Sequence, residues 1–477
     1  MTETRALVWF RNVMRLTDNP ALLAAVASGQ PIIPLFILDD DTPGDWRPGG
    51  ARRWWLHHSI KALDGELRQR GSRLLLQQGE TLTVLPELAK TVRATTVFAT
   101  RSYEPWARTL EDKLQKRLAA DGVTLKRFAG PLLFEPDDVA TKSGTPFQVF
   151  TPFWRTVAQR TPRKPQPAPK HIPTPDGLPR GDTLKNWDLL PTKPDWAGGL
   201  RETWEPGEAA ASAMLNIFLD DAVAQYQDDR NRPDIRGTSR LSPYLASGEI
   251  SPNVCWYAAQ SRGTGGGVET FLKELAWREF SYHLLFHWPD LPSSPFRDEF
   301  ADFPWAAKKS AISAWQKGLT GYPIVDAGMR ELWHTGWMHN RVRMVAASFL
   351  IKHLQVPWQT GEAWFWDTLV DADLANNSAS WQWVAGSGAD AAPYFRIFNP
   401  VKQGETFDPK GDYVRRWVPE LHALATEHIH APWLAPATAL EKAGIVLGKT
   451  YPRPIVDHAE ARERALAAFK SLKAAAE

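Results

Sequence analysis

The strongest constraint on the fold is a repeating pattern in the first 128 residues. Short apolar runs alternate there with amphipathic stretches of ten or more residues; the runs are ALVWF, IIPLFIL, RLLLQQ, TVFAT and VTLKRF. Buried strands that alternate with helices are typical of a parallel sheet covered by helices on both faces. We therefore predict a doubly wound parallel-sheet domain over residues 1–130. It contains neither a G-x-G-x-x-G motif after its first strand nor a Walker-type loop, which argues against nucleotide sites of those kinds.

Two changes of composition divide the rest of the chain. Between Thr161 and Trp196 proline is frequent and apolar periodicity is weak, which is typical of an extended connector. From about Gly207 onward, apolar residues recur at helical spacing between glycine and proline stops. We predict a connector over residues 131–206 and an almost entirely helical domain over residues 207–477, which ends in a packed amphipathic helix. The predicted fold class is α/β followed by all-α.

Composition limits the classes of function. The length of 477 residues indicates two or three domains, and a net charge of +2 means that any contact with nucleic acid needs a local basic patch. The single cysteine, Cys255, excludes an intrachain disulfide and a multi-thiolate metal site; we predict a buried thiol and no metal. Because we find neither a leader segment nor a long apolar stretch, we expect a cytoplasmic protein that is not attached to a membrane. We also expect a monomer without an obligate protein partner.

The segment from Tyr226 to Ser242 is the first candidate site. It places the hydroxyls of Thr238 and Ser239 just before a predicted helix. Free backbone N–H groups at a helix start, together with small hydroxyls, form a cradle for an anion such as phosphate. The alternative interpretation of these residues is an ordinary helix N-cap.

Two predicted helices carry stripes in which polar and aromatic residues mix. The first stripe lies in ELAWREF at i, i+3 and i+4 and consists of Glu274, Trp277 and Arg278. The second lies in WMHNRVRM at i, i+3, i+4 and i+7 and consists of Trp337, Asn340, Arg341 and Met344. An unpaired buried charge is costly, so neither stripe resembles an ordinary core face. The alternatives are a half-exposed helix with a Glu–Arg pair for the first, and a core stripe for the second.

A third candidate lies in LVDADLANN, where Asp371, Asp373 and Asn377 follow each other closely. Taken alone, these residues would form a solvated helix end. Together with the two stripes and the Tyr226 segment, they resemble the flavin and lesion pocket of photolyases for cyclobutane pyrimidine dimers, in the photolyase/cryptochrome family. The resemblance covers nearly the whole chain.

The resemblance implies an N-terminal antenna domain and a C-terminal helical domain that binds FAD. In the family, Arg343 pairs with Asp371 above the flavin, and Asn377 faces the redox nitrogen of the ring. The positions implied to contact FAD are Tyr226, Thr238, Ser239, Arg240, Leu241, Ser242, Arg343, Asp371, Asp373 and Asn377.

The resemblance also implies a site for damaged DNA. Glu274 would bond the polar edge of the pyrimidine, and Trp277 and Trp383 would stack on the extruded bases. Relatives that act on the other ultraviolet lesion, the (6-4) product, carry histidine in place of Asn340 and Met344, so the dimer is the favoured substrate. The implied lesion and phosphate contacts are Glu274, Trp277, Arg278, Asn340, Arg341, Met344, Trp383, Arg230 and Arg396; for Arg230 and Arg396 the alternative is a surface ion pair.

The implied function is that of a deoxyribodipyrimidine photo-lyase, in which light drives an electron from reduced FAD to the flipped-out dimer. Trp381, Trp358 and Trp305 match, in order from flavin to surface, the chain through which photolyases reduce their flavin. Plant cryptochromes carry aspartate at the Asn377 position; because an amide cannot donate a proton as an acid can, Asn377 favours repair over signalling. A cryptochrome-type blue-light receptor and a (6-4) photolyase remain the alternatives.

A second, light-harvesting chromophore is left open. Relatives that bind a deazaflavin carry Asp and Lys where this chain has Ser102 and Ala246, and the folate signature is also incomplete. The alternatives are a folate stacked on one of Trp46, Trp54 or Trp55, and an antenna domain without a chromophore.

Overall fold

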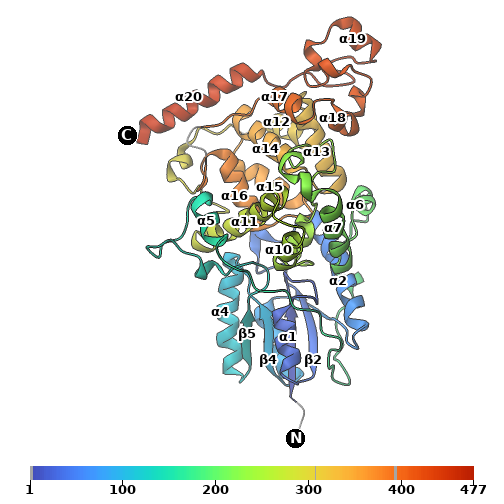
Figure 1. Ribbon diagram of the computed structural model, residues 1–477, viewed down its shortest axis with the longest axis vertical. Helices are drawn as coiled ribbons and strands as arrows, with labels where there is room; N and C mark the ends of the chain where they lie inside the picture. The colour runs from blue at the N-terminus through green and yellow to red at the C-terminus, as the bar shows by residue number, and fades with distance from the viewer. Residues whose placement is uncertain (1–3, 307, 392–394, 477) are drawn as a thin grey trace. The chain divides into compact units, whose positions relative to one another are not determined.

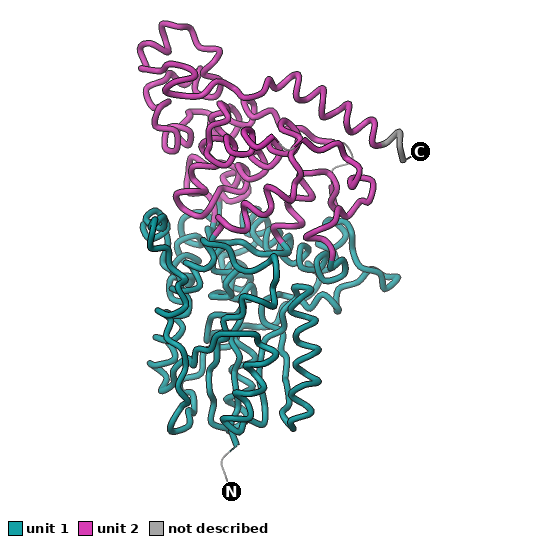
Figure 2. Tube along the Cα trace, turned by 180° about the vertical axis from the view of Figure 1, so that it is seen from behind, with its two compact units in different colours: residues 1–224, 239–289, 370–375 teal, residues 225–238, 290–369, 376–477 magenta. Residues whose placement is uncertain are grey.

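The computed structural model describes residues 4–306, 308–391 and 395–476 (Figure 1). By its internal contacts the chain divides into two compact units, whose segments alternate along the sequence (Figure 2). Unit 1 consists of residues 1–224, 239–289 and 370–375, and unit 2 of residues 225–238, 290–369 and 376–477. The domain limits predicted from the sequence, 1–130, 131–206 and 207–477, remain predictions.

Within the described residues, unit 1 contains a five-stranded parallel sheet in the order β3-β2-β1-β4-β5 (Figure 1). The chain winds outward from β1 to β3, returns to the other side of β1, and continues to β5. The strands are β1 (Arg5–Phe10), β2 (Ile32–Leu38), β3 (Leu75–Gln78), β4 (Ala94–Thr100) and β5 (Thr124–Phe128). The connecting helices are α1 (Pro20–Ala27), α2 (Gly50–Arg68), α3 (Thr81–Thr91) and α4 (Pro105–Ala120). The predicted doubly wound parallel sheet is confirmed.

Alternation along the central strand explains why both faces of the sheet are covered. Ala6, Val8 and Phe10 of β1 pack into a core that also contains residues of α1 and α2. Leu7 and Trp9 point to the opposite face and pack with residues of α3 and α4. Because successive side chains of a strand point to opposite sides, a run that is apolar throughout needs helices on both faces.

The proline-rich connector is packed against the sheet of unit 1. The backbone N–H of Ile172 donates to the carbonyl of Arg70 (3.1 Å), and that of Ile32 donates to the carbonyl of Pro173 (2.6 Å). Ile172 and Trp187 are 0% and 3% exposed and belong to the core on the α1 and α2 face. The connector is therefore extended, as predicted, but it also completes a core face.

The helices after residue 207 confirm the predicted helical character of the second half, whereas two further helices, α5 (Phe150–Val157) and α6 (Gly198–Thr203), lie within residues 131–206, the predicted connector. Both belong to unit 1, together with α7 (Glu208–Asp221), α9 (Ser242–Ala246), α10 (Pro252–Gln260) and α11 (Gly266–His287). Those of unit 2 are α8 (Tyr226–Asp229), α12 (Lys309–Gln316), α13 (Pro323–Thr335), α14 (Asn340–Ser348), a π-helical turn (Phe349–His353), α15 (Trp358–Thr368), α17 (Pro400–Phe407), α18 (Asp412–Trp417), α19 (Ala437–Lys442) and α20 (His458–Ala476). Helix α16 (Leu374–Ala385) begins in unit 1 and continues in unit 2.

Two smaller predictions are also confirmed. Cys255 is a free, fully buried thiol on α10. The terminal helix α20 packs through Ala465, Ala468 and Leu472 on a cluster that includes Phe300 and Phe303. None of the helices in the described part of the chain is both long enough and apolar enough to span a bilayer.

Replacing Ile172 by alanine tests whether the connector belongs to the folded core. The side chain is fully buried, so its loss should cost about 2 to 5 kcal/mol of stability. The measurement is the midpoint of urea unfolding followed by circular dichroism, with the exposed neighbour Lys170→Ala as control. Equal midpoints for the two variants would show that the connector does not contribute to the core.

Candidate functional site

Two carboxylates of the segment 370–375 are held by hydroxyl groups within unit 1. Ser242 donates to Oδ2 of Asp371 (2.6 Å), and the Tyr282 hydroxyl donates to Oδ2 of Asp373. Asp371 is only 8% exposed, so the alternative of a solvated helix end is wrong for this residue. Carboxylates with fixed orientation suit the N–H and hydroxyl groups of a flavin and its ribityl chain, and this part of the chain fits the predicted cofactor.

Arg52 supplies positive charge beside these carboxylates. It comes from α2 and donates to Ser247 Oγ (2.7 Å) and to the carbonyl of Val370 (3.0 Å). Burial lowers the pKa of Arg52, while the charges of Glu249, Asp373 and Asp371 act in the opposite direction. Sequence reasoning missed this residue, because nothing in the α2 pattern marks it as different from other helix arginines.

The segment of the predicted phosphate cradle is tightly turned. Its residues up to Thr238 belong to unit 2, and those from Ser239 onward belong to unit 1. In unit 2, a Cβ on Gly237 would lie 2.6 Å from the carbonyl oxygen of Asp229, so only glycine fits there. In unit 1, Arg240 has a positive φ of 53°, and its guanidinium lies 5.2 Å from the ring of Trp204. The helix that follows, α9, is one short turn. Thr238, Ser239 and Arg240 are half-buried, and Tyr226 and Leu241 are buried.

In unit 2, the Asn377 amide is oriented by a backbone contact. Its Nδ2 donates to the carbonyl of Glu362 (3.0 Å), and the neighbouring Ser378 hydroxyl donates to Glu362 Oε1 (2.5 Å). Burial raises the pKa of Glu362 to about 8. Asn377 is 8% exposed and therefore sits in a largely water-free environment.

The structure corrects the prediction for the stripe in WMHNRVRM. Helix α13 is closed by Gly336, which has a positive φ of 65°, and α14 begins only at Asn340. His339 is the N-cap, and its Nδ1 accepts from the backbone N–H of Arg341 (3.2 Å). Trp337 therefore lies before the helix and does not share its face. The residues of the stripe that do belong to α14 are Asn340, Arg341 and Met344.

Arg341, a predicted DNA contact of unit 2, is influenced electrostatically by two others, Arg230 and Arg396. The pKa of Arg341 is lowered first by burial and then by the like charges of Arg230 and Arg396. Arg341 donates to Asn231 Oδ1 (2.6 Å), and its guanidinium lies 4.4 Å from the ring of Phe407. Because Arg341 senses the positive charge of both other arginines, a phosphate would be favoured beside it. We name Arg230, Arg341 and Arg396 the arginine group.

The lesion-facing candidates of unit 1 lie on α11. One face of the Trp277 ring stacks on Phe150, with centroids 3.7 Å apart and planes within 9°. Arg278 donates to the carbonyl of Pro131 (2.9 Å) and pairs with Glu279 (3.2 Å). Its side chain is 10% exposed, and these are the contacts of a buried structural arginine. Glu274 lies one helical turn before Arg278 and is half-buried.

The three predicted electron-transfer tryptophans lie in unit 2 at different depths. Trp381 and Trp358 are each 2% exposed, whereas Trp305 is half-buried. The ring of Trp305 packs on that of Phe303, with centroids 4.4 Å apart. Helix α15 begins at Trp358, and Gly361 one turn later lies against Trp381: a Cβ on Gly361 would be 2.1 Å from the indole ring. The glycine thus brings the helices that carry Trp358 and Trp381 close together.

Gln382 is a second residue that sequence reasoning missed. It lies between Trp381 and Trp383 and is fully buried. Its Nε2 donates to the carbonyls of Leu291 and Ser294 (2.7 and 2.8 Å), and its Oε1 accepts from the N–H of Phe296 (2.7 Å). It fastens the loop 291–296 to α16 and so fixes the helix that carries both tryptophans.

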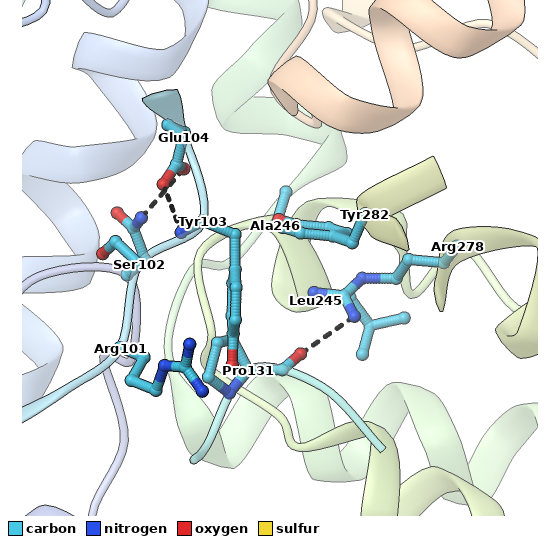
Figure 3. Close-up of a pocket in the computed structure, with 10 residues that line it drawn as sticks. Arg101, Ser102, Tyr103, Glu104, Pro131, Leu245, Ala246, Arg278 and Tyr282 are labelled. Atoms are coloured by element: carbon cyan, nitrogen blue, oxygen red, sulfur yellow. Dashed lines mark hydrogen bonds between the residues drawn. The ribbon is translucent and has the colours of Figure 1, made fainter. Parts of the chain in front are cut away.

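A narrow pocket of unit 1 bears on the light-harvesting chromophore. Ser102 and Ala246, the positions of the deazaflavin signature, both line it, together with the side chains shown in Figure 3. It leaves room for about one water molecule, so a three-ring chromophore could enter only if these side chains rearranged. Trp54 and Trp55 are 1% and 0% exposed and belong to the core, which excludes them as stacking platforms for a folate.

The comparisons with known proteins agree with this architecture. Residues 6–172 match the family profile of DNA photolyase, and residues 271–471 match the profile of the FAD binding domain of DNA photolyase. The chain therefore belongs to the photolyase/cryptochrome family, and its cofactor is FAD. The resemblance inferred from the motifs is confirmed.

Individual relatives narrow the place of the chain within the family. It is 51% identical to a deoxyribodipyrimidine photo-lyase of Agrobacterium fabrum over 98% of both chains. A crystal structure of a bacterial class III photolyase from Agrobacterium tumefaciens covers 99% of this chain and 98% of its own, with a TM-score of 0.96 and 51% identity. Cryptochrome-1 of Arabidopsis thaliana is 38% identical over 96% of this chain and 69% of its own length.

Replacing Gly361 by alanine should displace the indole of Trp381. The added methyl group would overlap the ring, and overpacking of this kind costs about 1 to 3 kcal/mol. Near-ultraviolet circular dichroism and the melting temperature report the change. Gly65→Ala, a helical glycine with no atom within 4 Å of its Cβ position, is the matched control and should stabilise the protein slightly. An unaltered spectrum in Gly361→Ala would mean that the ring has room to spare.

Proposed function

We propose that the protein is a deoxyribodipyrimidine photo-lyase that splits cyclobutane pyrimidine dimers in ultraviolet-damaged DNA, using light and reduced FAD. The identity of 51% to a relative of that name supports the proposal. The structural observation that carries it is the start of α14. There the exposed Asn340 and the half-buried Met344 share one short helix with Arg341 of the arginine group. The proposed lesion contact and the proposed phosphate contact would thus be held by the same helix.

The arginine group would bind the DNA backbone. Each guanidinium that neutralises a phosphate releases condensed counterions, so affinity should fall as salt rises. Phosphate contacts set position and do not read sequence, which suits an enzyme that must find a lesion in any context. Because Arg341 is repelled by Arg230 and Arg396, an approaching phosphate also relieves an unfavourable interaction within unit 2.

The lesion would be bound outside the duplex. Photolyases extrude their target, and a poorly stacked dimer costs less to extrude than the few kcal/mol that a normal base requires. Glu274 and Asn340 offer hydrogen bonds to the polar edges of the pyrimidines. Trp277 would stack on them with the ring face that Phe150 does not cover, and Trp383 would supply the second aromatic surface.

When bound and reduced, FAD supplies the electron that light transfers to the dimer. The chain orients the groups that would meet it: Ser242 holds Asp371, Tyr282 holds Asp373, and the Glu362 carbonyl holds the Asn377 amide. Such supporting hydrogen bonds keep a site in its working geometry. Trp381, Trp358 and Trp305 would carry electrons inward from the surface to restore the reduced cofactor.

The direct test is a repair assay. The purified, FAD-loaded protein is mixed with an oligonucleotide that contains one thymine dimer, with a reductant, under blue light. We expect recovery of the thymine absorption band in the light and none in the dark. A parallel oligonucleotide with a (6-4) product should remain unrepaired; repair of that lesion alone would make the protein a (6-4) photolyase. A flavin that bleaches and reoxidises without repair of either lesion would indicate a blue-light receptor of the cryptochrome type.

Arg341→Ala should weaken the binding of DNA at all sequences. Loss of one phosphate contact should also reduce the slope of log affinity against log salt by about 0.9 for duplex DNA. Fluorescence anisotropy over a series of salt concentrations measures both effects. Arg262→Ala removes the same charge from an exposed pair with Asp220 and is the control. Identical slopes for the two variants would remove Arg341 from the DNA interface.

A further inference from the structure

The hydroxyl of Tyr282 is aimed at one of the two carboxylates near the proposed flavin position. Tyr282 lies on α11, and its hydroxyl donates to Oδ2 of Asp373, which is 91 residues away in the sequence. The ring lines the narrow pocket of unit 1 (Figure 3), whereas the hydroxyl bonds to the segment 370–375. Tyr282 therefore connects the pocket wall with that segment.

The ring of Tyr282 is held in place from two sides. The Arg278 guanidinium lies 4.8 Å from its centroid, and Tyr103 meets it edge-on with centroids 5.9 Å apart. Tyr282 is 7% exposed, so little water competes for its hydroxyl. A clamped ring gives the hydroxyl one direction, and the hydrogen bond to Asp373 has a fixed geometry.

The charges nearby determine which group holds the proton. The pKa of Tyr282 is raised well above its ordinary value, first by burial and then by the charge of Asp373. The phenol therefore stays protonated and acts as the donor. The positive charge of Arg52 and the negative charge of Asp373 attract each other. Glu104 lines the pocket, and its pKa is raised first by burial and also by the charge of Asp373.

We propose that Tyr282 is a positioning residue for the flavin. Its hydroxyl fixes the Asp373 carboxylate and reduces the negative charge that this carboxylate presents to the flavin. The inference rests on the proposed function in one respect, namely that Asp373 meets the bound FAD. A hydrogen bond from a neutral hydroxyl spreads the charge of a carboxylate. Without it, the full charge would remain on Asp373 and would oppose the addition of an electron to the neighbouring ring.

The test is a redox titration of the FAD-loaded protein in the dark, which requires neither DNA nor repair. Tyr282→Phe keeps the ring and removes the hydroxyl. We expect the ratio of oxidised to reduced flavin at a fixed potential to rise roughly threefold to tenfold. Tyr103→Phe is the matched control, because Tyr103 lines the same pocket and is also buried but donates to Glu135 (2.6 Å). It should leave the ratio unchanged.

A second variant guards against loss of folding in Tyr282→Phe. A fluorinated tyrosine placed at position 282 keeps the shape and is a stronger donor, so the ratio should move in the opposite direction. The proposal is overturned if Tyr282→Phe gives the same flavin ratio as Tyr103→Phe or shifts the ratio toward reduced flavin. It is also overturned if the fluorinated side chain does not shift the ratio toward reduced flavin. If the thymine dimer is not repaired but the flavin ratio shifts as expected in both variants, only the proposed function would be overturned.

Discussion

The need to offset two negative charges organises the centre of unit 1. Asp371 and Asp373 lie in one six-residue segment, where Asp371 is buried and Asp373 is half-buried. A buried carboxylate costs several kcal/mol unless it is hydrogen-bonded and paired. Ser242 and Tyr282 provide the hydrogen bonds, and Arg52 provides the positive charge. Arg52 extends from α2, which covers the sheet, and it donates to Val370 of this segment. The segment belongs to unit 1, although its neighbours in sequence belong to unit 2.

The sequence predicted the elements well wherever burial alone determines them. Strand runs such as β1 and β2 are apolar throughout because both faces of the sheet are covered, and this leaves a signal that short segments already contain. The start of α14 shows where such reasoning fails. Its N-cap is His339, which lacks the usual signature of Ser, Thr, Asp or Asn, so the helical spacing was extended too far, to Trp337.

For the site, family resemblance indicated residues that are expected to meet a ligand, but it did not indicate the residues that hold them. Arg52 reaches the carbonyl of Val370 across 318 positions, and Gln382 reaches that of Leu291 across 91. Hydrogen bonds between residues so far apart in the sequence depend on the tertiary fold, and no local sequence pattern predicts them. The same holds for Gly361, whose missing side chain matters only because Trp381 fills the space.

The two charged clusters follow opposite principles, and the difference matches what each would bind. The carboxylates of unit 1 already have donors and a cation, so they can present fixed acceptors to a flavin without a large change in charge. Arg341 contacts Asn231 and Phe407, both uncharged, while two further arginines repel it. That repulsion disfavours the charged form of Arg341, and under the proposed function a bound phosphate would relieve it. A cofactor that stays bound is served by carboxylates whose charge is already offset within the protein, whereas a polyanion that must be bound and released would be served by arginines that repel one another.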